Sequence, residues 1–339
     1  MPLRQGNHTI RLQNPPSVLN YAAVVSKKES EGPLATYYDI INEDAMFGQT
    51  SWEKAESRMQ QEVAEKALDK ASLSPGQIDC LFAGDLLNQC IGSHYGLRDL
   101  DIPFVGIYGA CSTMAESLAL AALFVESGMA GNAMAVTSSH FCSAERQFRF
   151  PLEYGGTRTP TAQWTATAAG AAIVGQNGAS PYVRAVSFGS ILDMGVKDIN
   201  NMGAAMAPAA AQTIRRFFED TATNADNYDL VLTGDLAKVG STLLSELLER
   251  DGYQLGKKHA DCGLMIYDRE TQPDVNAGGS GCGCSAAVLC SYILQSMREG
   301  KLNDVLFVAT GALMSTVTVQ QGETIPAVAH LVHLSTQKE

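Results

Sequence analysis

Hydrophobic and polar positions along the chain form two kinds of pattern, long amphipathic stretches and short apolar runs. Trp52–Ala71 and Ala209–Thr223 carry apolar residues at the three-to-four-residue spacing of a helix. Ile78–Leu86 and Tyr228–Leu236 are apolar runs with Gly-Asp near their ends, which predicts buried strands that turn into loops. Helices that alternate with apolar strands favour βαβ units and largely parallel sheets.

The pattern occurs twice along the chain. Residues of the first apolar run recur at the same spacing in the second, namely Asp79, Gly84, Asp85 and Leu86 as Asp229, Gly234, Asp235 and Leu236. Cys111–Ser139 likewise matches Gly283–Gly311, and each predicts a small-residue turn, a helix, a stop that contains glycine and a buried strand. We therefore predict two similar halves, residues 1–178 and 179–339, with an insertion at about 26–48 in the first.

Charge and cysteine content narrow the classes of function. The net charge of −12 argues against sequence-independent binding of nucleic acid, because that needs a basic surface. Most of the eight cysteines lie in apolar surroundings, which predicts free, buried thiols. Cys282 and Cys284 are too close together for a usual zinc pair, and we expect no metal and no nucleotide cofactor. The N-terminal residues lack the apolar stretch of a signal peptide, and Ser117–Val125 is too short to cross a bilayer.

Cys111 is the strongest candidate for a reactive side chain. It follows an apolar strand at Phe104–Ile107 and precedes a helix that is apolar nearly all round. A thiol at a helix N-terminus feels the positive end of the helix dipole, so we expect its thiolate to be favoured and its pKa to fall. The alternative is a small buried thiol that only fills space.

Two stretches carry a resemblance to known families. The Gly-Ala-Cys-Ser turn at 109–112 within a repeated α/β unit resembles the thiolase superfamily, which includes the ketoacyl synthases. That resemblance implies an α/β fold of duplicated βαβαβαββ halves in α-β-α-β-α layers. The run SSHFCSAERQFRFPLEYGGTRTPTAQWT at Ser138–Thr165, together with GIYGACSTM at Gly106–Met114, is similar to the stage V sporulation protein AD family of Bacilli and Clostridia.

The second resemblance implies a function. Members of that family bind dipicolinic acid, pyridine-2,6-dicarboxylate, alone or with calcium, and act with membrane-embedded SpoVA proteins in sporulation and germination. It implies a non-catalytic protein without a resident cofactor, cytoplasmic and peripheral at the inner membrane of the forespore and spore. The superfamily also implies a homodimer through the strand after the Cys111 helix, here Ala133–Ser139.

The enzymes of the superfamily need partners for their cysteine. They place a His at the end of a strand in the second half, and an Asn or second His at the start of the matching helix. Here these positions hold Gly234 beside Asp235, and Gly283. We therefore favour binding over catalysis. The alternatives are an acyltransferase with Cys111 as nucleophile and a purely structural partner that keeps the fold for its interaction surface.

Candidate ligand-binding residues follow from the chemistry of an aromatic dianion. Guanidinium groups match carboxylates bidentately, an indole can cover a planar ring, and the amides of a glycine-rich turn can cradle a carboxylate. The candidates are Cys111, His140, Arg149, Arg158, Trp164, Asp235, Ser280 and Gly281.

Several of these candidates have structural alternatives. The arginines could form salt bridges with Glu145 and Glu153, and we favour that interpretation for Arg146. Trp164 could belong to the core, and His140 could be a satisfied histidine near the dimer interface.

Overall fold

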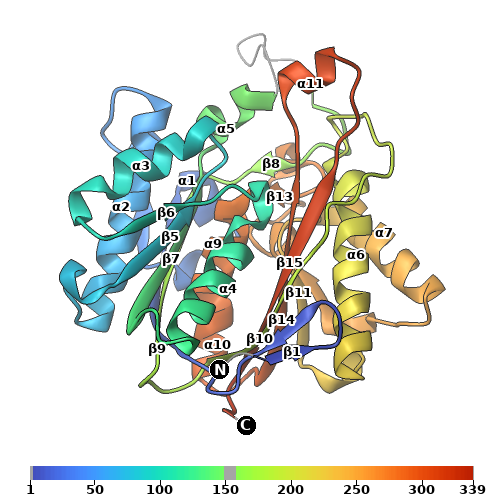
Figure 1. The fold of residues 1–339 in the computed structure, drawn as a ribbon. Coiled ribbons are helices and arrows are strands. Elements are labelled where there is room, and N and C mark those ends of the chain that lie inside the picture. The colour runs from blue at the N-terminus through green and yellow to red at the C-terminus, as the bar shows by residue number, and fades with distance from the viewer. Residues whose placement is uncertain (1–2, 149–157, 339) are drawn as a thin grey trace.

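The computed structural model describes residues 3–148 and 158–338, and it consists of two halves of the same design (Figure 1). The strands of the first half lie in the order β3 (Ser17–Ser26), β9 (Ala168–Gly175), β7 (Asn132–Ser139), β5 (Cys80–Gly84) and β6 (Phe104–Gly106). Those of the second half lie in the order β10 (Tyr182–Phe188), β15 (Ala327–Ser335), β14 (Asp304–Ala312), β11 (Leu230–Thr233) and β12 (His259–Asp261). The order matches strand for strand, which confirms the duplication.

Helices form three layers around these strands. Between the halves lie α4 (Thr113–Glu126) and α9 (Cys282–Val288), which continues through a π-helical turn (Leu289–Ile293) into α10 (Leu294–Arg298) (Figure 1). The outer layers are α2 (Trp52–Ala71) and α3 (Ile91–Leu97) on the first half, and α6 (Met202–Thr221) and α7 (Ala237–Arg250) on the second. This is the expected α-β-α-β-α arrangement. Most of α4 is buried, as its all-round apolar sequence predicts.

Shorter elements complete the described chain. They are β1 (Leu3–Gln5), β2 (Thr9–Arg11), α1 (Lys27–Ser30), β4 (Ile40–Asn42), α5 (Phe141–Phe148), β8 (Trp164–Thr165), α8 (Cys262–Met265), β13 (Gly279–Ser280) and α11 (Thr316–Gln320). The first two strands pair with each other, and β2 also pairs with β10, so the start of the chain lies on the sheet of the second half. The two half-sheets meet where Tyr182 pairs with Ser17.

Helix α2 begins and ends where its pattern predicts, whereas α6 begins at Met202 instead of Ala209. The Asn201 side chain accepts a hydrogen bond from the Ala204 amide and so caps the earlier start. Pro208 lies inside this helix, and such a residue normally signals a helix boundary, which explains the late prediction.

The expected dimer contact through Ala133–Ser139 stays a prediction, but this topology excludes extension of the sheet through that strand. Strand β7 is hydrogen-bonded to β5 on one side and to β9 on the other, so neither edge is available to a second copy. The free edge of the first half is β6. Val105 on that edge is 39% exposed and Tyr108 just after it is 47% exposed.

Candidate functional site

Cys111 lies at the start of the buried central helix, in the 3-10 turn (Ala110–Ser112) that leads into α4. The turn is tight, because the carbonyl of Gly109 approaches Gly311 of β14 so closely that a Cβ at Gly311 would overlap it. Cys111 borders a cavity of about 200 Å³ together with Ser280 of β13. The sequence therefore placed this cysteine correctly, between the two halves.

Asp235 is an ionisable neighbour of Cys111 whose charge acts on the thiol. It follows β11 and is fully buried, and its Oδ2 accepts hydrogen bonds from the Gly281 amide (2.8 Å) and the Ser280 hydroxyl (3.1 Å). The Cys111 Sγ lies 4.0 Å from the Ser280 Oγ. The structure thus brings together four of the candidates, Cys111, Asp235, Ser280 and Gly281. Of these, Cys111 and Ser280 border the cavity, whereas the buried Asp235 and Gly281 contact Ser280 without forming part of the cavity wall.

The protonation state of Cys111 differs from the expectation that its pKa falls. Burial raises the pKa of the thiol well above 9.0, and the negative charge of Asp235 raises it further. Burial also raises the pKa of Asp235 from 3.8 to about 7, although donation from the thiol counteracts this. The contact between the thiol and Asp235 does not meet the geometry of a hydrogen bond, because Asp235 Oδ1 has no hydrogen-bond partner among the described residues. The helix dipole is outweighed, so the cysteine is a neutral thiol at pH 7.

His140 does not border this cavity. It ends β7, and its Nε2 lies 2.8 Å from the carbonyl oxygen of Ala45, in the segment that the sequence pattern left outside the repeat. Burial lowers its pKa, so it is a neutral imidazole. The arrangement matches the alternative of a structural histidine only in part, because Nε2 has a backbone partner whereas the buried Nδ1 has no hydrogen-bond partner among the described residues.

Arg158 and Trp164 meet in a separate cluster on the outer side of β8. The guanidinium of Arg158 lies 3.4 Å from the buried carboxylate of Glu145 and 5.1 Å from the Trp164 ring centre. The Trp164 ring stacks on Phe141 at 4.0 Å between centres, and Lys28 lies over it at 4.2 Å. Neither residue borders the Cys111 cavity. Arg149 lies outside the described residues.

Other residues of the cavity were not anticipated. They come from the chain after β14 and from helix and loop ends of the first half, and include Asn88, Tyr108, Gln147 and Ser315. The repeat held a usable signal, because Gly311 corresponds to Ser139, so the chain after β14 leaves the sheet at the same end as the chain after β7. Arg146 forms a salt bridge, as the structural alternative proposed, but with Glu53 instead of Glu145 or Glu153, and it also borders the cavity.

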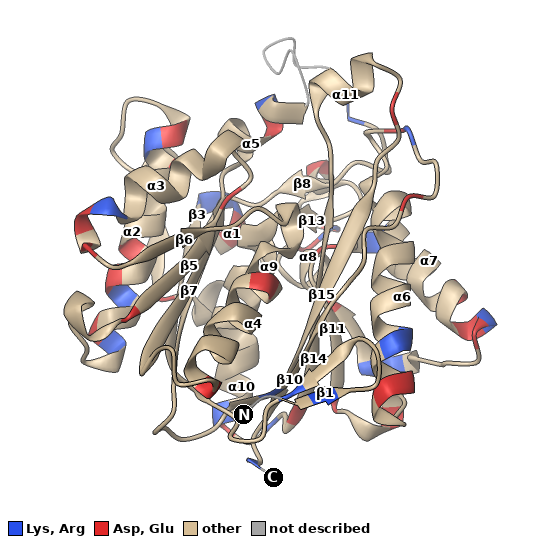
Figure 2. Ribbon diagram, viewed as in Figure 1, with Lys and Arg blue, Asp and Glu red and all other residues tan. Residues whose placement is uncertain are grey.

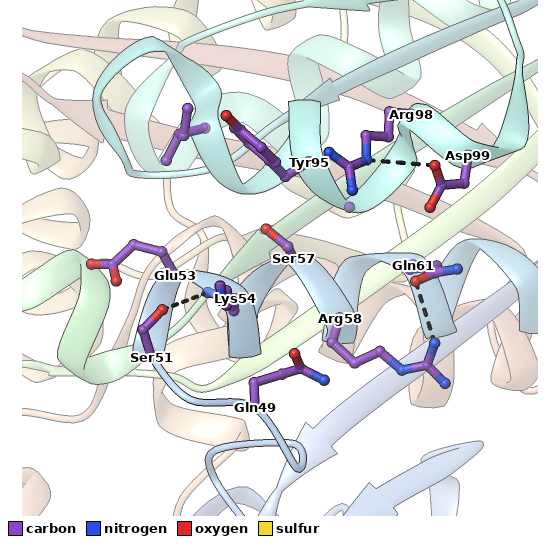
Figure 3. Close-up of a pocket in the computed structure, with 12 residues that line it drawn as sticks. Gln49, Ser51, Glu53, Lys54, Ser57, Arg58, Gln61, Tyr95, Arg98 and Asp99 are labelled. Atoms are coloured by element: carbon purple, nitrogen blue, oxygen red, sulfur yellow. Dashed lines mark hydrogen bonds and ion pairs between the residues drawn. The ribbon is translucent and has the colours of Figure 1, made fainter.

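A larger hollow lies elsewhere, between α2 and α3 on the outer face of the first half (Figure 3). It has a volume of about 780 Å³. Its charged side chains already have partners, because Arg98 pairs with Asp99 at 3.4 Å and Arg58 with Glu62 at 2.8 Å. We therefore place the candidate site at the smaller cavity, next to the buried Cys111 thiol and the Asp235 carboxyl, whose Oδ1 has no hydrogen-bond partner among the described residues.

Two further properties of the described residues bear on function. No described helix has both the length and the apolar character needed to traverse a bilayer. No cluster of three or more His, Cys, Asp or Glu side chains that could hold a metal ion occurs in the described part of the chain.

Known proteins resemble this chain in both sequence and fold. The profile of a family described as stage V sporulation protein AD (SpoVAD) matches residues 6–335. Stage V sporulation protein AD of Bacillus subtilis (strain 168) is 46% identical over 325 residues, which cover 96% of each chain. Among solved structures, 3-oxoacyl-[acyl-carrier-protein] synthase III from Aquifex aeolicus VF5 has a TM-score of 0.57 at 13% identity and covers 94% of this chain and 99% of its own.

Human mitochondrial 3-ketoacyl-CoA thiolase, solved in complex with CoA, is similar to the same degree. Its TM-score is 0.57 at 11% identity, with 96% of this chain and 99% of the thiolase covered. At such low identities these two structures establish the thiolase-like fold and nothing about chemistry.

Proposed function

The chain belongs to the stage V sporulation protein AD family, and from this premise we propose that it binds dipicolinic acid, alone or as its calcium complex, in the cavity beside Cys111. It would do so without catalysis, within the dipicolinate transport system of the spore and together with membrane-embedded SpoVA proteins. The single observation that supports binding over catalysis is the pairing of a neutral Cys111 thiol with a buried carboxyl, Asp235.

Proton transfer from Cys111 to Asp235 is unfavourable. The pKa of the thiol lies well above 9.0 and that of the carboxyl lies at about 7, so more than two pKa units separate donor and acceptor. Each unit costs about 1.4 kcal/mol. The six histidines of the chain all lie among the described residues, and none borders the cavity, so no imidazole offers a better base there.

The walls of the cavity suit a small polar ligand. Asn88, Gln147 and the Tyr108 hydroxyl make no side-chain hydrogen bond within the described residues, which leaves donors for carboxylate oxygens. Arg146 adds a guanidinium group, which is ion-paired with Glu53 in the ligand-free protein. At about 200 Å³ the cavity is smaller than the roughly 300–1,000 Å³ of pockets for drug-sized ligands. That size favours a single ring over a long acyl chain.

Asp235 sets the form in which a dicarboxylate can enter. Above its pKa of about 7 the carboxylate would repel the carboxylates of the ligand. A proton on Asp235 removes this repulsion, and a calcium ion carried in by the ligand offsets it. We therefore propose that free dipicolinate binds better below pH 7 and that the calcium complex binds with less dependence on pH.

Calorimetric titration at pH 6 and pH 8, with and without calcium, tests this proposal. Free dipicolinate should bind about tenfold more weakly at pH 8 than at pH 6, because each pH unit above the pKa costs about tenfold. Asp235→Asn should remove most of that difference. Asp193→Asn, which changes an exposed carboxyl of the second half, is the matched control. Absence of binding at both pH values, with and without calcium, would refute the proposed function.

The acyltransferase alternative makes a separate prediction. Acyl-CoA donors of several chain lengths would leave a thioester on Cys111 that intact-mass measurement detects, and Cys111→Ala would abolish it. We expect no adduct, because the neutral thiol is a poor nucleophile. An adduct that disappears in Cys111→Ala would support the enzyme instead.

A homodimer and attachment to the spore inner membrane also belong to this proposal. A second copy could extend the sheet at β6, where Val105 and Tyr108 expose apolar surface. Sedimentation should then show a dimer that Val105→Lys converts to a monomer, whereas Met129→Lys, at another exposed apolar position, leaves it intact. Fractionation of spores should place the protein with the inner membrane only while the SpoVA proteins are present.

A further inference from the structure

A second hollow lies at the lower end of the second half, beside the chain termini. It has a volume of about 320 Å³ and opens where α6 ends and the sheet continues past it. Its walls include Arg11 of β2 and Arg184 of β10, and its floor includes Phe217, Tyr228 and His333. Figure 2 shows Lys and Arg colour at this end, beside β1 and β10. The two arginines therefore enter one hollow from neighbouring strands.

A β-bulge places both arginines at the same hollow. Arg11 lies opposite Ala185 in the ladder between β2 and β10, and His333 lies opposite Ala185 on the other side, so these residues share one face of the sheet. Arg184 would point to the opposite face of a regular strand. The register between β10 and β15 shifts between Val183 and Ala185, however, and Arg184 also borders the hollow. Bulges commonly redirect a side chain next to a functional site.

The guanidinium groups in this hollow make no hydrogen bond within the described residues, although the positive charge of Arg184 acts on the Asp304 carboxylate. Neither Arg11 nor Arg184 forms a side-chain hydrogen bond or an ion pair within the described residues. Asp304, the one carboxylate in the wall, is bound to His333 at 3.0 Å between Oδ1 and Nε2. Asn227 accepts a hydrogen bond through its Oδ1, and its amino group has no partner within the described chain. Three groups are thus available to an incoming acceptor.

Charge makes this arrangement notable in an acidic protein. The chain carries a net charge of −12, yet two guanidinium groups here face one hollow, whose one carboxylate already binds a histidine. Guanidinium donates two parallel N–H bonds to a carboxylate or phosphate oxygen pair, which a point charge cannot do. The His333 ring lies edge-on to Tyr228 at 5.3 Å between centres, so the floor is built of packed aromatic rings.

We propose that Arg11 and Arg184 form a binding site for a small oxyanion of the phosphate type, separate from the cavity beside Cys111. The guanidinium groups would bind the phosphoryl oxygens from two sides and the amino group of Asn227 would donate to a third oxygen. The same chemistry would fit a free phosphate, a phosphorylated small molecule or the headgroup of a phospholipid. We assign the site to a soluble anion, because the net charge of −12 opposes approach to an anionic membrane.

Titration with inorganic phosphate tests the site. Arg11→Gln and Arg184→Gln should each weaken phosphate binding at least about tenfold, because each removes a bidentate donor. Arg11→Lys and Arg184→Lys keep the charge and should weaken it less. Arg216→Gln is the matched control, since it removes a partly exposed arginine of α6 that binds Ser190 outside the hollow. Melting curves show whether each variant is folded.

Two further arms separate the possible sources and the two sites. Vesicles of phosphatidylglycerol should not bind, whereas vesicle binding without phosphate binding would overturn the inference. Dipicolinate binding should persist in Arg11→Gln and Arg184→Gln. Phosphate binding that is absent, or that Arg216→Gln weakens as much as Arg184→Gln does, would overturn the inference. Either result would leave the proposed role of the Cys111 cavity untouched.

Discussion

The two Gly-Asp turns have the same sequence pattern but different partners. In the first half, Asp85 stabilises its own loop, because its Oδ1 accepts from the Leu87 amide (2.8 Å) and its Oδ2 from the Ser93 amide (2.7 Å) and hydroxyl (2.6 Å). It also lies beside the buried Glu56, whose pKa burial and the charge of Asp85 raise to about 8. Asp85 therefore serves the interior of its own half.

In the second half a different residue stabilises the loop. Asp261, at the end of β12, accepts from the amides of Leu236 (2.8 Å) and Ala237 (2.9 Å) and from the Thr233 hydroxyl (2.6 Å). Asp235 is consequently released to bind Ser280 and Gly281 beside Cys111. A duplicated turn can thus keep its shape while the carboxyl of one copy stabilises the loop and the carboxyl of the other binds residues beside Cys111.

The largest effects should come from the carboxyls that stabilise the loops. Asp85→Ala and Asp261→Ala each orphan two buried amides, at about 1–3 kcal/mol apiece, so each should lower the free energy of unfolding by roughly 2–6 kcal/mol at pH 5. Asp235→Ala orphans one amide, that of Gly281, and should cost roughly half as much. Urea unfolding measures all three. If Asp235→Ala lowers the free energy of unfolding as much as Asp85→Ala does, while Asp261→Ala lowers it little, then Asp235 and not Asp261 stabilises the loop of the second half.

A second effect concerns pH and Asp235. Burial raises its pKa from 3.8 in the unfolded chain to about 7, so the stabilisation is complete below about pH 4 and is lost as pH rises through 7. Asp235→Asn stays neutral, and relative to wild type it should gain roughly 4 kcal/mol in the free energy of unfolding between pH 4 and pH 8.

Urea titrations of ligand-free protein at several pH values measure this gain. Since Asn keeps an acceptor for the Gly281 amide, the two proteins should be similar in stability at pH 4. A difference between Asp235→Asn and wild type that stays constant from pH 4 to pH 8 would show that Asp235 is ionised throughout, contrary to the account.

A smaller effect concerns the reactivity of Cys111. Its pKa is raised by burial and by Asp235, so iodoacetamide should modify the partly exposed Cys142 before Cys111. In Asp235→Asn the loss of the neighbouring charge should lower the pKa of Cys111, raise its thiolate fraction and so speed its alkylation. Peptide mass mapping follows both sites. Rapid alkylation of Cys111 in the wild type would support an activated nucleophile.

The smallest effect lies at the rim of the cavity. Glu53 and Arg146 form a partly exposed ion pair, so Glu53→Gln should change the free energy of unfolding by less than about 1 kcal/mol. It should at the same time release Arg146 and strengthen dipicolinate binding a few-fold. Thermal melts and calorimetry separate the two effects, and weaker ligand binding in Glu53→Gln would argue against a role for Arg146.

Sequence periodicity predicted the fold because it reports local geometry. Helix α2, the order of helices and strands, and the position of Cys111 all follow from apolar spacing and from the internal repeat. The repeat also drew attention to Asp235, since its mate Asp85 stands after the matching strand. These features depend on residues that are near one another in the chain.

The remaining features of the site depend on contacts between distant residues. The hydrogen bonds from the amides after β11 to Asp261 join two neighbouring strands. The residues next to Asp261 in the sequence do not predict them. His140 contacts the carbonyl oxygen of Ala45, a residue distant in the chain, and does not border the cavity. The pKa of Cys111 likewise reflects burial and Asp235, which outweigh the helix terminus that is visible in the sequence.

A crystal structure grown with dipicolinate and calcium tests the central claim most directly. The account predicts ligand density in the cavity between Cys111 and Ser280, with carboxylate oxygens near Asn88 or Gln147 and calcium or a proton between the ligand and Asp235. An empty cavity in crystals whose protein binds dipicolinate in solution, or a ligand found only between Arg11 and Arg184, would contradict it.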